Sequence, residues 1–301
     1  MDNRFAEPTH AKAPSITRRG ALKRCGLGLA GLTLARFGLN EAQAIANGQL
    51  DGNGHPNVGG FVWLNNIWSS DPPPVFVGSG VLIHPRVILT VGHGTQPTES
   101  AIVSGVMSID DLRISFAPDA SDPRTWRPVA GLLTHPGYSD ISNNTEDVGV
   151  VILQKAVTRI APVPLPPLGF LDTLEAAGEL RANSARTRFT VIGYGVVPGD
   201  ANFGHLPFPP DGLRRVAQPE FRGLHERWVY LDQNASHDNG GTAGGDSGGP
   251  LFWVDPATGR ETLVAITSRG TLTNSDSYRV DTETALGFLN HVIYMVDAGE
   301  L

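Results

Sequence analysis

The sequence of 301 residues contains a single cysteine, Cys25. One cysteine excludes an intramolecular disulfide and a zinc site built from a cysteine cluster. Basic residues are also few, because 23 lysines and arginines stand against 30 aspartates and glutamates. The net charge of −7 argues against broad nucleic-acid binding through phosphate contacts. The histidines match no metal-binding spacing, so we expect neither a metal nor a cofactor.

The apolar stretch near the N-terminus, residues 25–35, is short. A membrane-spanning helix needs about 20 apolar residues. Thr17-Arg18-Arg19 precedes this stretch, and Ala42-Gln43-Ala44 follows it. That order of basic, apolar and small residues is typical of a secretory signal, and the paired arginines resemble a twin-arginine export signal. The alternative is a buried or membrane-anchored N-terminal helix.

We therefore expect residues 1–44 to be a twin-arginine-type signal peptide of bacterial kind. Its partners would be the export machinery and a signal peptidase. The product, residues 45–301, would be secreted or periplasmic and would keep no stable membrane anchor.

The rest of the chain reads as an all-β protein. Its 36 glycines and 23 prolines exceed what a helical bundle tolerates. Short apolar runs bounded by turn residues predict strands of a sandwich or barrel. These runs are Phe61–Leu64, Val87–Thr90, Val148–Leu153, Thr190–Ile192 and Leu263–Ile266.

A helix is predicted only near the C-terminus. Apolar residues there fall on one helical face, with Asp281 or Thr282 as the N-cap. This face consists of Leu286, Leu289, Val292, Ile293 and Val296. The proline-rich stretch Pro162–Pro167 is a candidate linker between two halves, about 45–165 and 166–301.

The most specific motif is Gly244-Gly245-Asp246-Ser247-Gly248-Gly249-Pro250. A serine hydroxyl becomes a nucleophile when a base removes its proton. Flanking glycines let the backbone approach a substrate and direct its N–H groups at one point. A glycine-rich turn with an incidental serine is the alternative, and seven specific residues in succession disfavour it.

Two further segments supply the groups that such a serine needs. The run Val87–Thr90 leads into Val91-Gly92-His93-Gly94, which presents a histidine that can act as a general base near neutral pH. Asp147 directly precedes the apolar run beginning at Val148, where a carboxylate can orient an imidazole. Alone, each of these residues is more often structural.

In the order His93, Asp147, Ser247, the chain resembles the trypsin/chymotrypsin-like serine endopeptidases. The resemblance extends from Ile45 to about Leu289. Three further segments resemble motifs of this family: His135-Pro136-Gly137-Tyr138, Val191-Ile192-Gly193-Tyr194-Gly195 and Ile266-Thr267-Ser268-Arg269-Gly270. It implies two six-stranded antiparallel β-barrels with the site between them, followed by the C-terminal helix.

The resemblance also implies roles for the residues. Ser247 would attack a peptide carbonyl, His93 would transfer the proton, and Asp147 would hold the imidazole. The backbone N–H groups of Gly245 and Ser247 would form the oxyanion hole. Protein or peptide substrates would be the partners.

Four residues match substrate-binding positions of this family: Gly241, Ser268, Arg269 and Gly270. Trypsin-like members that cleave after Lys or Arg carry an aspartate where this chain has Gly241, so we expect a different specificity. Arg269, where the family usually has tryptophan, either attracts an acidic side chain or points to solvent. Gly94 and Ala243 occupy positions where relatives have cysteines.

Ile45 and Asp246 match the family's activation pair, a newly cut N-terminus and a buried carboxylate. The expected signal-peptidase cut lies directly before Ile45. Export itself would then activate the enzyme. The alternatives are a separate activating protease, or an Asp246 held by other partners.

Two other classes of function stay open at the level of the sequence. One is a catalytically silent binding protein on a protease fold. The other is an esterase-type hydrolase that acts on acyl groups other than peptides.

Overall fold

The computed structural model describes most of the chain beyond residue 47. The described residues are 48–65, 74–140, 146–182, 184, 187–195, 211–234, 237, 239–271 and 273–301. All of them belong to one of two units of the chain, residues 41–301. The expected signal peptide, residues 1–44, and Ile45 lie outside the described residues.

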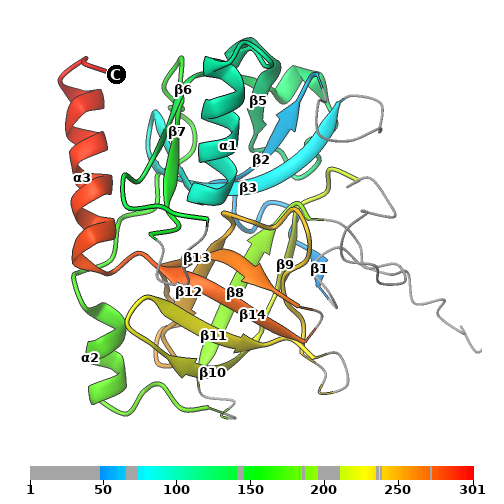
Figure 1. Ribbon diagram of the computed structural model, residues 1–301. Helices are drawn as coiled ribbons and strands as arrows, with labels where there is room; N and C mark the ends of the chain where they lie inside the picture. The colour runs from blue at the N-terminus through cyan, green and yellow to red at the C-terminus, as the bar shows by residue number, and fades with distance from the viewer. Residues whose placement is uncertain are drawn as a thin grey trace, which may run out of the picture. The chain divides into compact units, whose positions relative to one another are not determined.

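The N-terminal half forms a closed antiparallel barrel of six strands in the order β2-β3-β4-β7-β6-β5 (Figure 1). The strands are β2 (Val58–Trp63), β3 (Val75–His84), β4 (Val87–Thr90), β5 (Leu112–Ser115), β6 (Arg127–Thr134) and β7 (Gly149–Leu153). All five residues of β7 are buried. Val151 and Leu153 pack in one apolar cluster and Val150 and Ile152 in another, because both faces of this strand are covered. That explains its unbroken apolar sequence.

The C-terminal half forms a second ring of antiparallel strands. Its strands are β8 (Arg188–Gly193), β9 (Arg215–Ala217), β10 (Glu220–Leu224), β11 (Trp228–Asp232), β12 (Pro250–Val254), β13 (Glu261–Gly270) and β14 (Asn274–Arg279). The ring β8-β10-β11-β14-β13-β12 closes because β12 pairs with β8. The expected fold class, two six-stranded antiparallel barrels, is confirmed.

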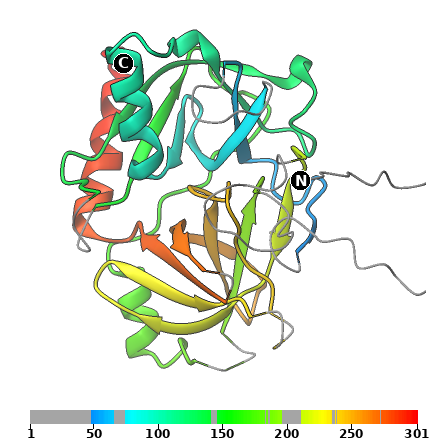
Figure 2. The same ribbon diagram turned by 45° about the vertical axis from the view of Figure 1, so that its right-hand side comes forward.

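One short strand departs from the expected division of the chain. β1 (Gln49–Leu50) precedes the first barrel in sequence but pairs with β9, as Figure 2 shows. These residues therefore belong to the second sheet, although the expected boundary places them in the first half. The proline-rich stretch Pro162–Pro167 lies between β7 and α2 (Phe170–Ala176) in a region without helix or strand.

The predicted C-terminal helix is α3 (Glu283–Asp297). Its Leu289, Val292 and Val296 are buried in the largest apolar cluster, beside Val150 and Ile152 of β7. Figure 1 shows α3 running alongside the first barrel. Thr282, one of two candidates, is the N-cap, since its Oγ1 accepts a hydrogen bond from the Ala285 N–H at 3.3 Å.

Other helices were not expected from the sequence. They are α1 (Gly92–Val103), α2, and two 3₁₀ turns, η1 (Ile109–Asp111) and η2 (Pro123–Thr125). No helix in the described part of the chain has the length and apolarity that crossing a membrane requires.

Candidate active site

The loop that carries Ser247 is held by close backbone packing against the first barrel. Gly248 has φ +84°, and a Cβ there would lie 2.0 Å from Thr90 Oγ1 and 2.3 Å from the Ser79 carbonyl oxygen. Only glycine fits such a backbone in so little space. The Gly248 N–H also donates to the Thr267 carbonyl of β13 at 2.8 Å. Both barrels therefore fix the position of this loop.

His93 lies in the first turn of α1, directly after β4 ends. Val91, the N-cap, gives no side-chain hydrogen bond to the helix. The His93 N–H instead donates to Asp147 Oδ1 at 2.8 Å. A helix start leaves such N–H groups without internal partners, so the carboxylate both caps α1 and fixes the place of His93.

Asp147 is also the partner of the imidazole. Its Oδ2 lies 2.8 Å from His93 Nδ1 and accepts a hydrogen bond from Ser268 Oγ of β13. A Cβ on Gly92 would lie 2.8 Å from the Tyr138 ring and 3.3 Å from Asp147 Oδ1. The glycine therefore leaves room for the carboxylate and the tyrosine to approach the turn.

Hydrogen bonds keep Asp147 ionised. Burial alone disfavours the carboxylate, but hydrogen bonds and charge interaction with His93, together with the Ser268 hydroxyl, lower the pKa of Asp147 below its usual value. An ionised carboxylate only accepts hydrogen bonds, which places the imidazole proton on Nδ1. Nε2 is then free to accept, and it lies 3.1 Å from Ser247 Oγ. The imidazole of His93 is therefore placed to accept the proton of the Ser247 hydroxyl.

Two backbone donors lie beside the serine. No described residue accepts a hydrogen bond from the N–H of Gly245 or of Ser247. Gly245 has φ +92°, a conformation that suits glycine. Buried or half-buried backbone N–H groups normally have partners, and unpaired ones beside a hydroxyl can bind a developing oxyanion.

Ser79 of β3 is a contact residue to which sequence reasoning assigned no role. Its N–H donates to the Ser247 carbonyl at 2.9 Å, and its hydroxyl donates to the Gly245 carbonyl at 3.2 Å. The same hydroxyl accepts from the Tyr194 N–H at 3.0 Å. Ser79 therefore ties the nucleophile loop to the first barrel. The pattern Gly78-Ser79-Gly80 gave no way to foresee contacts with residues so distant in sequence.

The expected substrate-binding residues differ in their surroundings. The Ser268 hydroxyl is directed at Asp147. Arg269 is half exposed, pairs with Asp276 at 3.1 Å and lies over the Trp228 ring at 4.3 Å. Gly270 is exposed at the end of β13. The guanidinium of Arg269 is thus already engaged by an acidic and an aromatic neighbour.

Gly241 packs directly against Gln233. A Cβ on Gly241 would lie 2.2 Å from Gln233 Oε1. The Gln233 amide donates to the carbonyls of Thr242 and Thr271 at 2.9 and 2.6 Å, and its Oε1 accepts from the Thr242 N–H at 2.7 Å. Gln233 is only 1% exposed. Its carboxamide therefore bridges the two chain segments that carry the expected substrate-binding residues.

Asp246 is fully buried beneath the loop. Its carboxylate accepts from the backbone N–H groups of Gly195 and Ala243, each at 2.8 Å. Burial outweighs these bonds and raises the pKa of Asp246 to about 7. Among the described residues, no cation lies within salt-bridge distance of it. The proposed partner, Ile45, lies outside the described residues.

In the part of the chain that the structure describes, no three His, Cys, Asp or Glu side chains gather as metal ligands. The histidine, aspartate and serine are brought together with two N–H donors, which is an arrangement suited to acyl transfer. Comparison of the sequence with protein-family models gives no match, and comparison with curated proteins gives none either.

Proposed function

We propose that this protein is a serine endopeptidase of the trypsin/chymotrypsin-like type, secreted after removal of a twin-arginine signal. The observation that carries the proposal is the unbroken contact chain from Ser268 through Asp147 and His93 to Ser247. The N–H groups of Gly245 and Ser247, for which no described residue is an acceptor, support it. The double barrel is compatible with this type of protease.

The geometry supports a reaction in two stages, acylation of the serine and hydrolysis of the acyl-enzyme. Ser247 Oγ attacks the peptide carbonyl carbon while its proton passes to His93 Nε2. The carbonyl oxygen becomes an oxyanion that the N–H groups of Gly245 and Ser247 bind. When the C–N bond breaks, Nε2 gives the proton to the leaving amine. Water then enters and hydrolyses the acyl-enzyme by the same route. Asp147 stays ionised and stabilises the charged imidazole throughout.

The test is digestion of a peptide library by the protein expressed from the full-length chain, read by mass spectrometry. Ser247→Ala and His93→Ala should each lower turnover by about 10⁴-fold or more while leaving the fold intact. Circular dichroism checks the fold. Wild-type-like rates in either variant would refute the mechanism.

The same experiment separates the alternatives. Cleavage of esters with no cleavage of peptides would point to an esterase-type hydrolase. Failure of Ser247 to react with a phosphonate, in a folded protein, would point to a silent binding protein. Strong cleavage after Lys or Arg would contradict the specificity expected from Gly241.

We also propose that export activates the enzyme. Asp246 is buried, and among the described residues no cation lies within salt-bridge distance of it, although the charge of Arg215 acts on it from farther away. An amino group at Ile45 would therefore be a suitable partner. Sequencing the N-terminus of the secreted protein tests this. Activity in a product that begins at any residue other than Ile45 would exclude export activation. A mature protein beginning at Ile45, with an inactive full-length chain, is the expected result.

A further inference from the structure

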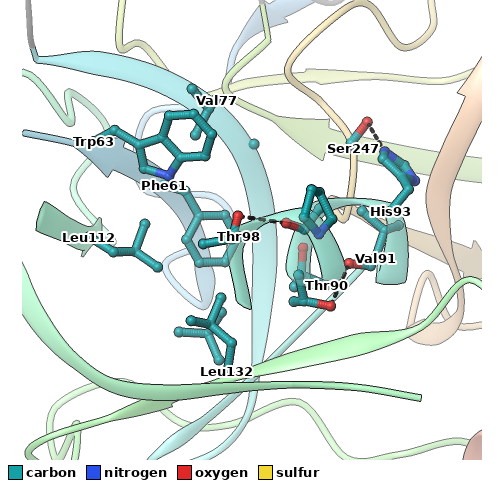
Figure 3. Close-up of a pocket in the computed structure, with 15 residues that line it drawn as sticks. Phe61, Trp63, Val77, Thr90, Val91, His93, Thr98, Leu112, Leu132 and Ser247 are labelled. Carbon is teal, nitrogen blue, oxygen red and sulfur yellow. Dashed lines mark hydrogen bonds between the residues drawn. The ribbon is translucent and has the colours of Figure 1, made fainter. Parts of the chain in front are cut away.

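An apolar cavity opens directly beside the serine and histidine (Figure 3). Its volume is about 270 Å³. His93 and Ser247 stand at one end, while Trp63, Leu112 and Leu132 lie at the other. An apolar cavity of about 150 Å³ is enough to hold benzene, so this one has room for a large aliphatic or aromatic side chain.

Away from His93 and Ser247, the walls of the cavity are mostly apolar. Phe61, Trp63, Val77 and Leu132 supply apolar walls. Threonine hydroxyls that border it already donate to carbonyls of the chain. Thr90 Oγ1 donates to the Ser79 carbonyl at 2.9 Å, and Thr98 Oγ1 donates to the Gly94 carbonyl at 2.8 Å. A polar or charged side chain would lose hydration there without compensation.

The position of the cavity assigns it to one side of the scissile bond. Apart from Ser247, every lining residue belongs to the first barrel or to α1. His93 must give its proton to the leaving amine, so the leaving half of the substrate lies beside His93 in the proposed reaction. The acyl half of the substrate would then lie beside β13 of the second barrel, which carries Arg269 and Gly270.

Among the described residues of the second barrel, Gln233 fills the space directly beside Gly241. Gln233 occupies the region between Thr242 and Thr271 with a hydrogen-bonded amide. Thr242 Oγ1 closes it further by donating to Ser275 Oγ at 3.0 Å. A large side chain on the acyl half would have to displace these buried bonds, whereas one on the leaving half enters a preformed cavity.

We propose that this cavity recognises a bulky apolar side chain on the residue that follows the scissile bond. The inference rests on the proposed endopeptidase function. Selectivity then depends chiefly on the leaving half of the substrate. Phenylalanine, leucine or methionine after the bond should be favoured over glycine or aspartate, because the cavity removes a large apolar side chain from water.

The test uses two quenched fluorescent peptides that differ only in the residue after the cut, phenylalanine or glycine. The ratio of their kcat/KM values should be about 10–100 in the wild type. Leu132→Phe fills the far end of the cavity and should bring the ratio close to one. Leu133→Phe is the matched control. Leu133 neighbours Leu132 on β6 and is similarly half buried, but it does not line the cavity. It should keep the wild-type ratio.

Labelling by an alkyl fluorophosphonate accompanies each measurement. Its leaving fluoride is too small to need the cavity, so labelling reports whether Ser247 is activated. If Leu132→Phe fails to label, Val77→Leu, a smaller filling change, replaces it. A wild-type ratio near one, with cleavage retained, overturns this inference alone. A fall of the ratio in Leu133→Phe equal to that in Leu132→Phe overturns it too. Absence of both labelling and cleavage overturns the proposed function instead.

Discussion

Single contacts between distant residues set the geometry of the candidate site. Asp147 accepts hydrogen bonds from both the backbone and the ring of His93, so one carboxylate fixes a helix start and an imidazole together. Ser268 adds a further donor from the second barrel. The relative position of the two barrels therefore determines whether the imidazole faces Ser247.

Ser79 should be a positioning residue for the nucleophile loop. Ser79→Ala removes the hydroxyl bonds to the Gly245 carbonyl and the Tyr194 N–H. We expect the free energy of unfolding to fall by about 1–3 kcal/mol, because both partners are left unpaired. We expect kcat to fall about tenfold with little change in KM, since the Gly245 N–H loses its alignment.

Denaturant unfolding and steady-state kinetics measure these effects. Ser100→Ala is the control, because its exposed hydroxyl bonds only to the Gln96 carbonyl within α1. Unchanged kcat in Ser79→Ala would show that the loop keeps its alignment without this hydroxyl.

At the scale of helices and strands, some elements are predictable from the local sequence pattern, whereas others depend on contacts with residues far away in the sequence. Val87–Thr90 was predicted as a strand and is β4 at the same residues. The face of α3 was predicted because its apolar residues recur at helical spacing. α1 was missed because Gly92, Gly94 and Pro97 disfavour a helix. It starts where Asp147, 54 residues away, accepts the His93 N–H.

In the candidate site, too, some residues are predictable from the local sequence and others are not. Ser247, His93 and Asp147 stood out in sequence because each lies in a short distinctive segment. Gln233 did not, because nothing around it in the sequence shows that its amide bridges Thr242 and Thr271. The cavity was equally hidden, since its walls come from six strands and a helix. Such features depend on the packing of both barrels.

Two glycines of the C-terminal helix region should respond oppositely to alanine. Gly287 lies inside α3 with open space around its Cα, so Gly287→Ala should raise the free energy of unfolding by about 0.5–1 kcal/mol. Gly299 also faces open space, but its φ is +73°. Gly299→Ala should therefore lower stability by about 1 kcal/mol.

Urea unfolding of the two variants gives both values. Because neither new methyl group meets a neighbour, the difference isolates backbone conformation. Stabilisation by both substitutions would contradict this account.

At the scale of the whole molecule, a buried charged group joins the start of the described chain to the second barrel. Arg214 is fully buried and donates to Asp51 Oδ2 at 2.8 Å. His55 lies between Asp51 and Glu261, with Nε2 3.0 Å from the Glu261 carboxylate. Burial disfavours the charged imidazole, but the two carboxylates outweigh it and raise the pKa of His55 to about 9.

This raised pKa gives a pH dependence of stability. The contribution of His55 is complete below pH 6.5, the ordinary value, and is lost as pH rises through about 9. After allowance for partial exposure, it amounts to about 1–2 kcal/mol. His55→Gln should therefore be less stable than the wild type at pH 6, with the difference narrowing between pH 6.5 and 9.

Thermal unfolding across that pH range measures the difference. His291→Gln, at an exposed position of α3, should follow the wild type at every pH. A His55→Gln deficit that is equal at pH 6 and pH 10 would disprove the charge-based account.

The pairing of β1 with β9 has a consequence for the order of folding. Gln49 meets Val216, a residue made much later on the ribosome. Contacts between such distant residues form slowly, because a long loop must close first. The first residues of the fold thus find their final neighbours only after the whole first barrel has been synthesised. Until β9 has been synthesised, the backbone of β1 lacks the partner strand that it has in the folded protein.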